Sequence, residues 1–213
     1  MTEKEMEIKL DLVNEQFFNR LLDYLQDPEE LRRQTNYFFD TENHDLACSG
    51  WALRFRTYGD RAIITAKGIV SGNIDGLTVR PEIEELIEIE KLREALENGI
   101  DIKELPEKIS RIFVETGIRG IVRKLLSFTT ERHIFAYSFD NLQIEFELDR
   151  TEYSDGSVDY ELEVEIDDIS LFETALREVE RILERLKIPC NYQSESKFGR
   201  ALKKIGIDTG PAE

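Results

Sequence analysis

Charged and apolar residues alternate close to the amino terminus, where residues 5–9 read EMEIK. A strand sends successive side chains to opposite faces, so Glu5, Glu7 and Lys9 would share one face and the apolar residues the other. Two carboxylates and an ammonium on one face have two explanations. They could form the solvated face of an ordinary strand, or they could hold a metal ion and a phosphate group.

The same alternation recurs along several later segments, and each segment carries charges of mainly one sign. Residues two apart on a strand lie on the same side, about 6.6 Å from each other. The basic set consists of Arg54, Arg56 and Lys67, and the acidic set consists of Glu82, Glu84, Glu145, Glu147, Asp149, Glu161, Glu163 and Glu165.

Any one of these strands fits a half-buried sheet with an apolar inner face and a charged outer face. The whole set fits less well, because like charges directly opposite one another on neighbouring strands are destabilising. Separate acidic and basic strands suit a polyanion bound together with a metal ion. Carboxylates would hold the metal, and Arg and Lys would hold the phosphate oxygens. Both interpretations stay open at this point.

Composition limits the classes of protein that remain. The chain has 213 residues, 40% of them apolar and 34% charged, which indicates a globular fold of one large or two small domains. Its net charge of −17 opposes binding to duplex nucleic acid and to anionic membranes, but is compatible with a small basic pocket. No apolar run reaches the roughly 20 residues of a membrane span, and the first residues lack the pattern of a secretory signal. We therefore expect a cytoplasmic protein.

Few residues could provide nitrogen or sulfur ligands for a metal. Cys48 and Cys190 are far apart and outside any CxxC pattern, so we interpret them as free, partly buried thiols. The only histidines of the chain are His44 and His133. A metal ion would therefore have oxygen ligands, which suits Mg²⁺, Mn²⁺ or Ca²⁺.

Hydrophobic periodicity predicts an α+β fold with about eight strands, paired mainly as hairpins in an antiparallel sheet or barrel. Asn14 is expected to cap a helix that ends near Leu25. Turns are expected near Gly59 and Gly156. The expected strands lie within 3–13, 34–41, 50–68, 76–87, 128–139 and 141–167, and the expected later helices lie in pieces over 88–116, over 170–186 and within 194–205, with a loop over 72–76.

The order of the charged motifs resembles that of the CYTH superfamily, also called triphosphate tunnel metalloenzymes. EMEIK is similar to its ExExK signature, and the later motifs that carry the resemblance are YFFDT (37–41), LRFR (53–56), TAKG (65–68), RPEIEE (80–85), ERHIF (131–135), FELD (146–149), YELEVE (160–165) and SKF (196–198). The resemblance implies a closed eight-stranded antiparallel β-barrel with helices outside and a charged tunnel within. It also implies a single domain over 1–213, with a helical insertion over 88–130 and a flexible tail over 207–213.

Family roles carry over only where the motifs match. The resemblance implies that Glu5, Glu7, Glu161 and Glu163 bind one or two Mg²⁺ or Mn²⁺ ions, and that Glu5, Glu7 and Lys9 form the catalytic set. It implies that the triphosphate oxygens are held by Lys9, Arg54, Arg56, Lys67, Arg132 and Lys197, and that Glu82 or Glu84, and Glu147 or Asp149, complete the acidic set or orient the bases. Thr130 stands where several members carry a basic residue.

Three functions are compatible with these residues. The resemblance favours metal-dependent hydrolysis of a small triphosphate, which would be tripolyphosphate, thiamine triphosphate or a nucleoside triphosphate. A class IV adenylate cyclase would use the same tunnel, but the residues MTEK before the signature lack the aromatic residue and histidine of known cyclases. The third function is a non-catalytic module that binds polyphosphate. We expect no nucleic acid duplex and no membrane as a partner, and a monomer or a homodimer as the assembly.

Overall fold

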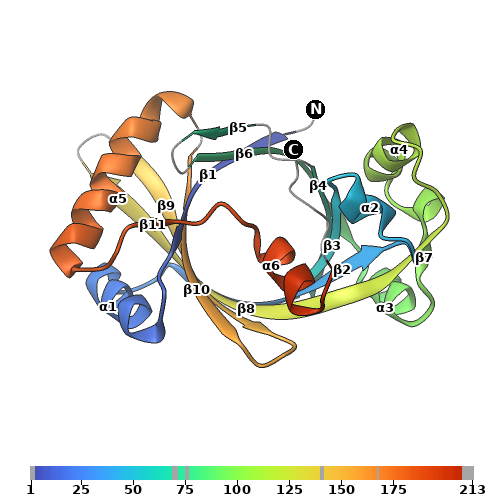
Figure 1. Cartoon of the computed structure of the whole chain (residues 1–213), viewed down its shortest axis with the longest axis horizontal. Helices are drawn as coiled ribbons and strands as arrows, with labels where there is room; N and C mark the ends of the chain where they lie inside the picture. The colour runs from blue at the N-terminus through green and yellow to red at the C-terminus, as the bar shows by residue number, and fades with distance from the viewer. Residues whose placement is uncertain (1–2, 69–71, 75–76, 140–141, 167, 208–213) are drawn as a thin grey trace.

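A closed antiparallel β-barrel forms the centre of the computed structural model, which describes residues 3–68, 72–74, 77–139, 142–166 and 168–207 (Figure 1). The pairing of the first strand, β1, with β6 closes the ring, and every strand of the ring is antiparallel to its neighbours. This is the fold that the sequence predicts. In order around the ring, the strands are β1 (Glu3–Asp11), β10 (Val158–Glu165), β9 (Leu142–Tyr153), β8 (Ile121–Phe139), β2 (Glu30–Asp40), β3 (Ala52–Tyr58), β4 (Arg61–Lys67) and β6 (Leu77–Ile87).

Short strands and helices flank this ring. In Figure 1, α1 and α5 lie on one side of the barrel, α2, α3 and α4 lie on the other side, and α6 lies across the opening of the ring. The short strands are β5 (Gly72–Ile74), β7 (Ile100–Asp101) and β11 (Asn191–Tyr192), and the helices are α1 (Glu15–Leu25), α2 (Asp45–Cys48), α3 (Ile89–Asn98), η1 (Ile102–Glu104), α4 (Glu107–Glu115), η2 (Ile169–Leu171), α5 (Phe172–Leu186) and α6 (Lys197–Lys204).

The outer face of β1 explains the apolar half of its alternating pattern. Ile8 and Leu10 are buried in one cluster with Phe18 of α1 and Val179 of α5. Asn14 caps α1 as expected, because its side chain accepts a hydrogen bond at 3.0 Å from a backbone N–H of the first turn. Since the apolar face of β1 points outward under these helices, its charged face points into the barrel.

The segment that matches no motif covers the opposite side of the barrel. Leu92 of α3 and Phe113 of α4 are buried in one cluster with Leu53, Phe55 and Ile64 of β3 and β4. These side chains exclude water from the outer face of the two strands. The insertion therefore has a packing role in the fold.

Helix α6 packs at one end of the barrel rather than against its outer wall. Phe198 stacks on Phe38 of β2, with the ring centroids 4.4 Å apart and an angle of 13° between the ring planes. Leu202 belongs to the same apolar cluster, together with Phe128 and Tyr153 of the barrel wall. This packing closes one end of the interior and brings Lys197, the first residue of α6, to it.

Two expectations about the elements are wrong. Strand β8 begins at Ile121 rather than Phe128, because Ile121 and Val122 pair with the short strand β7. The segment 72–76 is not simply a loop, since Gly72–Ile74 pairs with β6, while 75–76 lie outside the described residues. Both differences arise from backbone pairing, which residue propensities alone do not reveal.

The cysteines and the carboxyl-terminal segment agree with the expectation only in part. Cys48 and Cys190 are free, but both are exposed rather than partly buried. At the expected tail, Ile207 packs against the cluster around α6, and residues 208–213 lie outside the described part of the chain. None of the helices described here is both long enough and apolar enough to cross a membrane.

Asp40, in the YFFDT motif, organises the connection between β2 and β3. Its buried carboxylate accepts hydrogen bonds from the backbone N–H groups of Thr41, Leu46 and Ala47 at 2.7, 2.9 and 3.0 Å. Burial raises the pKa of Asp40, although these three N–H groups act in the opposite direction. The carboxylate satisfies donors at the start of α2 that would otherwise be buried without an acceptor.

We expect Asp40→Ala to lower the free energy of unfolding by about 2–4 kcal/mol, because it leaves these donors without an acceptor. Urea denaturation followed by circular dichroism measures the change. The matched control is Glu42→Ala, an exposed side chain in the same connection, for which a change within about 0.5 kcal/mol is expected. Equal stability of Asp40→Ala and the wild type would show that the carboxylate does not hold this connection.

Candidate functional site

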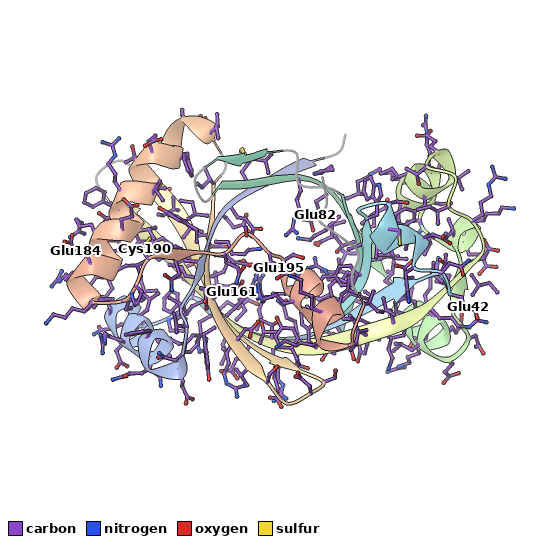
Figure 2. All side chains as sticks on the ribbon, in the orientation of Figure 1. Glu42, Glu82, Glu161, Glu184, Cys190 and Glu195 are labelled. Atoms are coloured by element: carbon purple, nitrogen blue, oxygen red, sulfur yellow. The ribbon has the colours of Figure 1, made fainter. Side chains whose placement is uncertain are left out.

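The strand register turns the charged faces of the barrel strands toward one interior. Lys9 lies opposite Glu163, and Glu163 lies opposite Glu147 on the next strand. On another part of the wall, Arg54 lies opposite Thr65 of β4. Alternation along each strand then places the expected site residues of the barrel on inward faces. Figure 2 shows the side chains of the described residues on the ribbon, and some of them lie inside the ring.

Four acidic side chains of β9 and β10 form the acidic cluster, which we define as Glu147, Asp149, Glu161 and Glu163. All four residues are more than nine-tenths buried. Arg132 of β8 donates from Nε and Nη2 to the two oxygens of Asp149 at 2.7 and 2.6 Å, and from Nη2 to Glu163 Oε2 at 2.6 Å. It also pairs with Glu147. The guanidinium of Arg132 is therefore surrounded by carboxylates.

Lys197 enters the acidic cluster from α6. Its Nζ lies 3.0 Å from Asp149 Oδ2 and 2.8 Å from Glu163 Oε1, and it also contacts Glu161. Arg200, one helical turn later, pairs through Nη1 with Glu161 Oε1 at 2.9 Å. One helix thus supplies two cations to the same group of carboxylates.

Lys9 connects the first strand to the acidic cluster. Its Nζ lies 2.9 Å from Glu7 Oε1 and 3.1 Å from Glu163 Oε1, and Arg80 Nη2 lies 3.2 Å from the same Glu7 oxygen. The second oxygen of Glu7, Oε2, is buried and accepts no hydrogen bond from any residue that the structure describes. The side chain of Glu5 lies outside the described part of the chain, but its backbone pairs with Arg80 of β6.

Arg54 and Lys67 lie on the wall formed by β3, β4 and β6. Arg54 Nη2 lies 3.5 Å from Glu82 Oε1 and 3.8 Å from Glu84 Oε2, and donates to Thr65 Oγ1 at 3.2 Å. Lys67 Nζ lies 2.8 Å from Glu82 Oε2. Glu82 thus contacts both basic side chains, and Glu84 contacts Arg54. Such contacts are what a role in orienting these basic side chains requires.

Arg56 has different surroundings from the other inward-facing cations. Its Nε donates to Asn36 Oδ1 at 3.1 Å, and no carboxylate in the described ranges lies within ion-pair distance of it. Burial lowers the pKa of Arg56 to about 9, and repulsion from Arg54 and Arg132 adds to the effect. Its hydrogen bond goes to a neutral amide, and Glu84 and Glu147 oppose the lowered pKa only in part, so a bound anion would add compensation at this position.

Opposite charges lower the pKa of two carboxyl groups of the acidic cluster, those of Asp149 and Glu163. Burial alone would lower the pKa of Lys197, but the carboxylates around it outweigh burial and raise that pKa well above its usual value. Burial alone would raise the pKa of Glu163, but the three cations around it outweigh burial and lower that pKa well below its usual value. Glu147 behaves differently: burial raises its pKa to about 7, and Arg132 opposes this only in part.

Carboxylate oxygens are donors that Mg²⁺ and Mn²⁺ prefer, and Glu7 and the acidic cluster bring them together. The unsatisfied Oε2 of Glu7 is a buried acceptor that a cation would satisfy. Within the described ranges, however, no three acidic, histidine or cysteine side chains form a preassembled metal cage. Lys9, Arg132 and Lys197 lie between the carboxylates instead. The donor set therefore fits a divalent ion if at least one of these cations moves.

A comparison of the sequence with family models decides the family. The model of the CYTH domain matches residues 3–199, a range that includes every strand of the barrel and the start of α6. The chain belongs to the CYTH family. No curated protein sequence matches it.

Solved structures similar to this CYTH chain include one described as a triphosphatase. The Hippeastrum protein HpAC1, described as an adenylyl cyclase candidate with a dominant triphosphatase activity, has 28% identity and a TM-score of 0.82, with 98% of this chain and 99% of that chain covered. An adenylate cyclase candidate from Bacillus halodurans has 25% identity and a TM-score of 0.71, with 92% and 97% covered. A Pyrococcus horikoshii protein with 18% identity and a TM-score of 0.58, with 94% and 99% covered, shows likeness of fold alone.

Comparison of the motifs did not identify three side chains that contact the expected site residues inside the barrel. Arg80 stands two residues before Glu82, so strand alternation could have placed it on the same face. Arg200 stands one helical turn after Lys197, so helical spacing could have found it. Asn36 lies opposite Arg56 on the neighbouring strand, and no signal in its own sequence segment indicates that contact.

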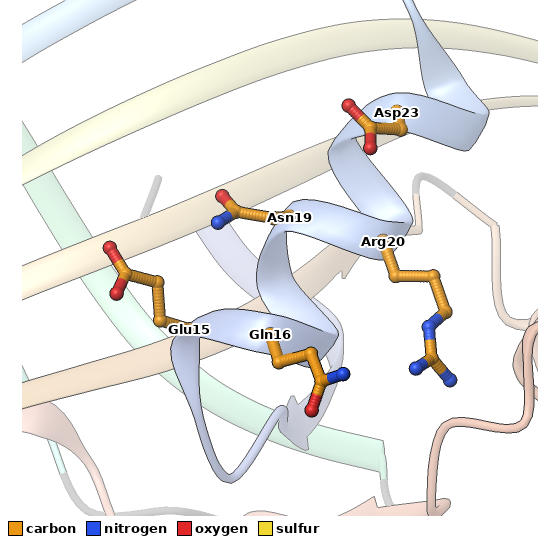
Figure 3. A pocket seen from close by; sticks show the side chains of 5 residues that line it. All are labelled: Glu15, Gln16, Asn19, Arg20 and Asp23. Atoms are coloured by element: carbon orange, nitrogen blue, oxygen red, sulfur yellow. The ribbon is translucent and has the colours of Figure 1, made fainter.

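Two other polar features of the CYTH chain contribute no charge to the interior. Thr130, where several members carry a basic residue, is buried, and its hydroxyl lies 3.0 Å from that of Thr151. Figure 3 shows side chains of α1, a helix outside the barrel, that line a surface pocket. These side chains are those of Glu15, Gln16, Asn19, Arg20 and Asp23.

We expect Glu147→Gln to gain stability relative to the wild type as the pH rises from about 5 to 8 in metal-free buffer. In the folded protein this carboxyl has a pKa of about 7 and keeps its proton over the lower part of this window, while the same carboxyl is already ionised in the unfolded chain. The contribution of Glu147 to the stability of the wild type therefore declines as the pH rises through this window. Glutamine has no such proton, so the difference in unfolding free energy should shift by about 1–3 kcal/mol toward the variant.

Urea denaturation at three pH values across this window measures the difference. The matched control is Glu145→Gln, at an exposed position on the same face of β9. A difference for Glu147→Gln that does not change with pH, or that follows the same course as for Glu145→Gln, would contradict the raised pKa of Glu147.

Proposed function

We propose that this CYTH protein is a metal-dependent triphosphatase that cleaves a phosphoanhydride bond of a small triphosphate held inside the barrel. The observation that carries the proposal is Arg56, an inward-facing cation whose Nε donates to the neutral side chain of Asn36 at 3.1 Å. Burial and neighbouring cations lower its pKa. A bound polyanion would compensate the charge of Arg56 and Arg54 together. The similarity to HpAC1, for which a dominant triphosphatase activity is described, supports the same reaction.

Basic side chains from separate parts of the chain are assigned to the triphosphate oxygens. Guanidinium groups are suited to this role, because they present paired N–H donors in a fixed plane. All of the assigned residues except Arg56 are paired with carboxylates. A triphosphate would take over some of these donors and free the carboxylates for metal ions. The assigned residues are Lys9, Arg54, Arg56, Lys67, Arg132 and Lys197.

Glu5, Glu7, Glu161 and Glu163 are assigned to one or two Mg²⁺ or Mn²⁺ ions. When bound, such an ion neutralises negative charge on the phosphate oxygens. Lys9 contacts both Glu7 and Glu163 and so fixes carboxylates of two strands at one place. Glu147 and Asp149 both pair with Arg132. These contacts favour a role in which the two carboxylates orient the Arg132 side chain.

A class IV adenylate cyclase is the second candidate, because the Hippeastrum and Bacillus halodurans proteins are both described as adenylate cyclase candidates. A cyclase would use the same cations and carboxylates, but the 3′-hydroxyl of ATP would replace water as the nucleophile. The residues MTEK before the first motif lack the aromatic residue and histidine that known cyclases carry there. This difference favours hydrolysis.

A phosphate-release screen distinguishes the candidates. Tripolyphosphate, thiamine triphosphate and nucleoside triphosphates are each incubated with the protein in Mg²⁺ and in Mn²⁺, and the nucleotide products are analysed for cyclic AMP. Phosphate release without cyclic AMP supports a triphosphatase, and cyclic AMP from ATP supports a cyclase. Calorimetric binding of tripolyphosphate without any product would indicate a non-catalytic binding module and refute the proposal.

We expect Glu7→Gln to lower kcat on the preferred triphosphate on the order of 100-fold or more, because it removes a charged metal ligand. Glu5→Gln is expected to have a similar effect. Circular dichroism and a thermal melt check that both variants fold. The matched control is Glu15→Gln on the outside of the barrel, which should keep wild-type turnover. Wild-type turnover in both first-strand variants would refute the metal assignment, and loss of folding would show that the two residues are structural.

We expect Arg56→Ala to lower kcat/KM about 10- to 100-fold for every triphosphate, because one charge-assisted contact to the shared triphosphate group is lost. Steady-state kinetics on tripolyphosphate and on one organic triphosphate measure the effect. The matched control is Arg33→Ala, at an exposed position of β2, which should leave both substrates unaffected. A loss confined to the organic substrate would mean that Arg56 contacts the organic group.

A further inference from the structure

Lys197 occupies the centre of the carboxylates that the proposed function assigns in part to a metal ion. Its Nζ contacts oxygens of Asp149, Glu161 and Glu163, at 3.0 Å for Asp149 and 2.8 Å for Glu163. The exposed fraction of the side chain is 12% for the lysine and at most 7% for the carboxylates. Lys9, Arg132 and Arg200 also contact these carboxylates, so several cations compensate them together. A divalent ion could replace the Lys197 ammonium in this balance.

A divalent ion and the Lys197 ammonium would compete for the same oxygens. Mg²⁺ binds carboxylate oxygens at about 2.0–2.1 Å, so an ion on Glu161 and Glu163 would lie within a few ångströms of the present Nζ position. Two cations that close together, in a site with little water, repel each other strongly. Glu7, whose buried Oε2 accepts no hydrogen bond from the described residues, is joined to Glu163 through Lys9 and could complete the ligands of the ion.

Helix α6 depends on the acidic cluster for more than one contact. Arg200 pairs with Glu161 at 2.9 Å and with Asp159 at 2.7 Å, so both Lys197 and Arg200 are bound to Glu161. Stacking of Phe198 on the barrel wall adds an apolar contact at the same end. An ion that takes over Glu161 would therefore weaken two of the charged contacts that hold the helix.

We propose that α6 is a plug locked by Lys197, and that a divalent ion at Glu161 and Glu163 displaces Lys197 and loosens the helix from this end of the barrel. The inference rests on the proposed function, which assigns these carboxylates to the ion. Ion binding and loosening of the plug are then thermodynamically coupled, so each favours the other. The displaced ammonium becomes available to a phosphate group of the substrate.

Hydrogen–deuterium exchange on the wild-type protein tests the plug directly. The amides of residues 197–204 should exchange roughly tenfold or more faster in Mn²⁺ than in EDTA, while the amides of α5 should not change, because only the plug opens. Slower or unchanged exchange of this segment under saturating Mn²⁺ would overturn the inference. This measurement needs no variant, so it does not depend on whether a substituted chain folds.

Isothermal titration with Mn²⁺ alone tests the competition. Lys197→Met should bind Mn²⁺ roughly tenfold or more tightly than the wild type, because the competing cation is gone. The matched control is Lys203→Met on the same helix, where the exposed lysine pairs with Glu195 at 2.9 Å, and its affinity should equal that of the wild type. Unchanged or weaker binding by folded Lys197→Met would overturn the inference.

The same samples separate the inference from the proposed function. Wild-type protein that hydrolyses triphosphates while α6 exchange is unaffected by Mn²⁺ would refute the plug and leave the function intact. Protein in which Mn²⁺ loosens α6 but which turns over no triphosphate would refute the function and leave the plug intact. Absence of Mn²⁺ binding to the wild type would refute both.

Discussion

Charge compensation inside a closed barrel is the constraint on which the rest of this structure depends. Closure sends every second side chain of each strand inward, and in this chain many of those side chains are charged. Buried charges cost several kcal/mol unless they are paired. The acidic strands β9 and β10 therefore face cations from β1, β8 and α6, and Arg132 and Lys197 each contact more than one carboxylate.

A charged interior moves the apolar cores to the outside of the barrel. One core lies between β1 and the helices α1 and α5, and a second lies between β3, β4 and the insertion that contains α3 and α4. The third core is small and lies at the end that α6 closes. Helices are thus needed on the outside to bury apolar surface that an ordinary barrel would bury within.

Two of the places where the compensation is incomplete suit the proposed ligands. Arg56 has no carboxylate within ion-pair distance among the described residues, so it is a position where an added anion would gain. Glu7 has a buried oxygen without a donor, so it is a position where an added cation would gain. The ion pairs elsewhere keep the interior stable and can exchange partners when a metal ion and a polyanion enter together.

Strand alternation alone determined which side chains share a face, because the direction of a side chain on a strand depends on whether its position is odd or even. The resemblance to the CYTH superfamily predicted that the charged face is the inner one. The order of the motifs likewise identified the family and the barrel. Which inward side chains meet could not be determined in this way. Arg132 and Lys197 both lie among carboxylates, Arg56 does not, and α6 brings Arg200 to Glu161. These contacts depend on strand register, on closure of the ring and on the docking of a helix distant in sequence, and only the tertiary structure decides those.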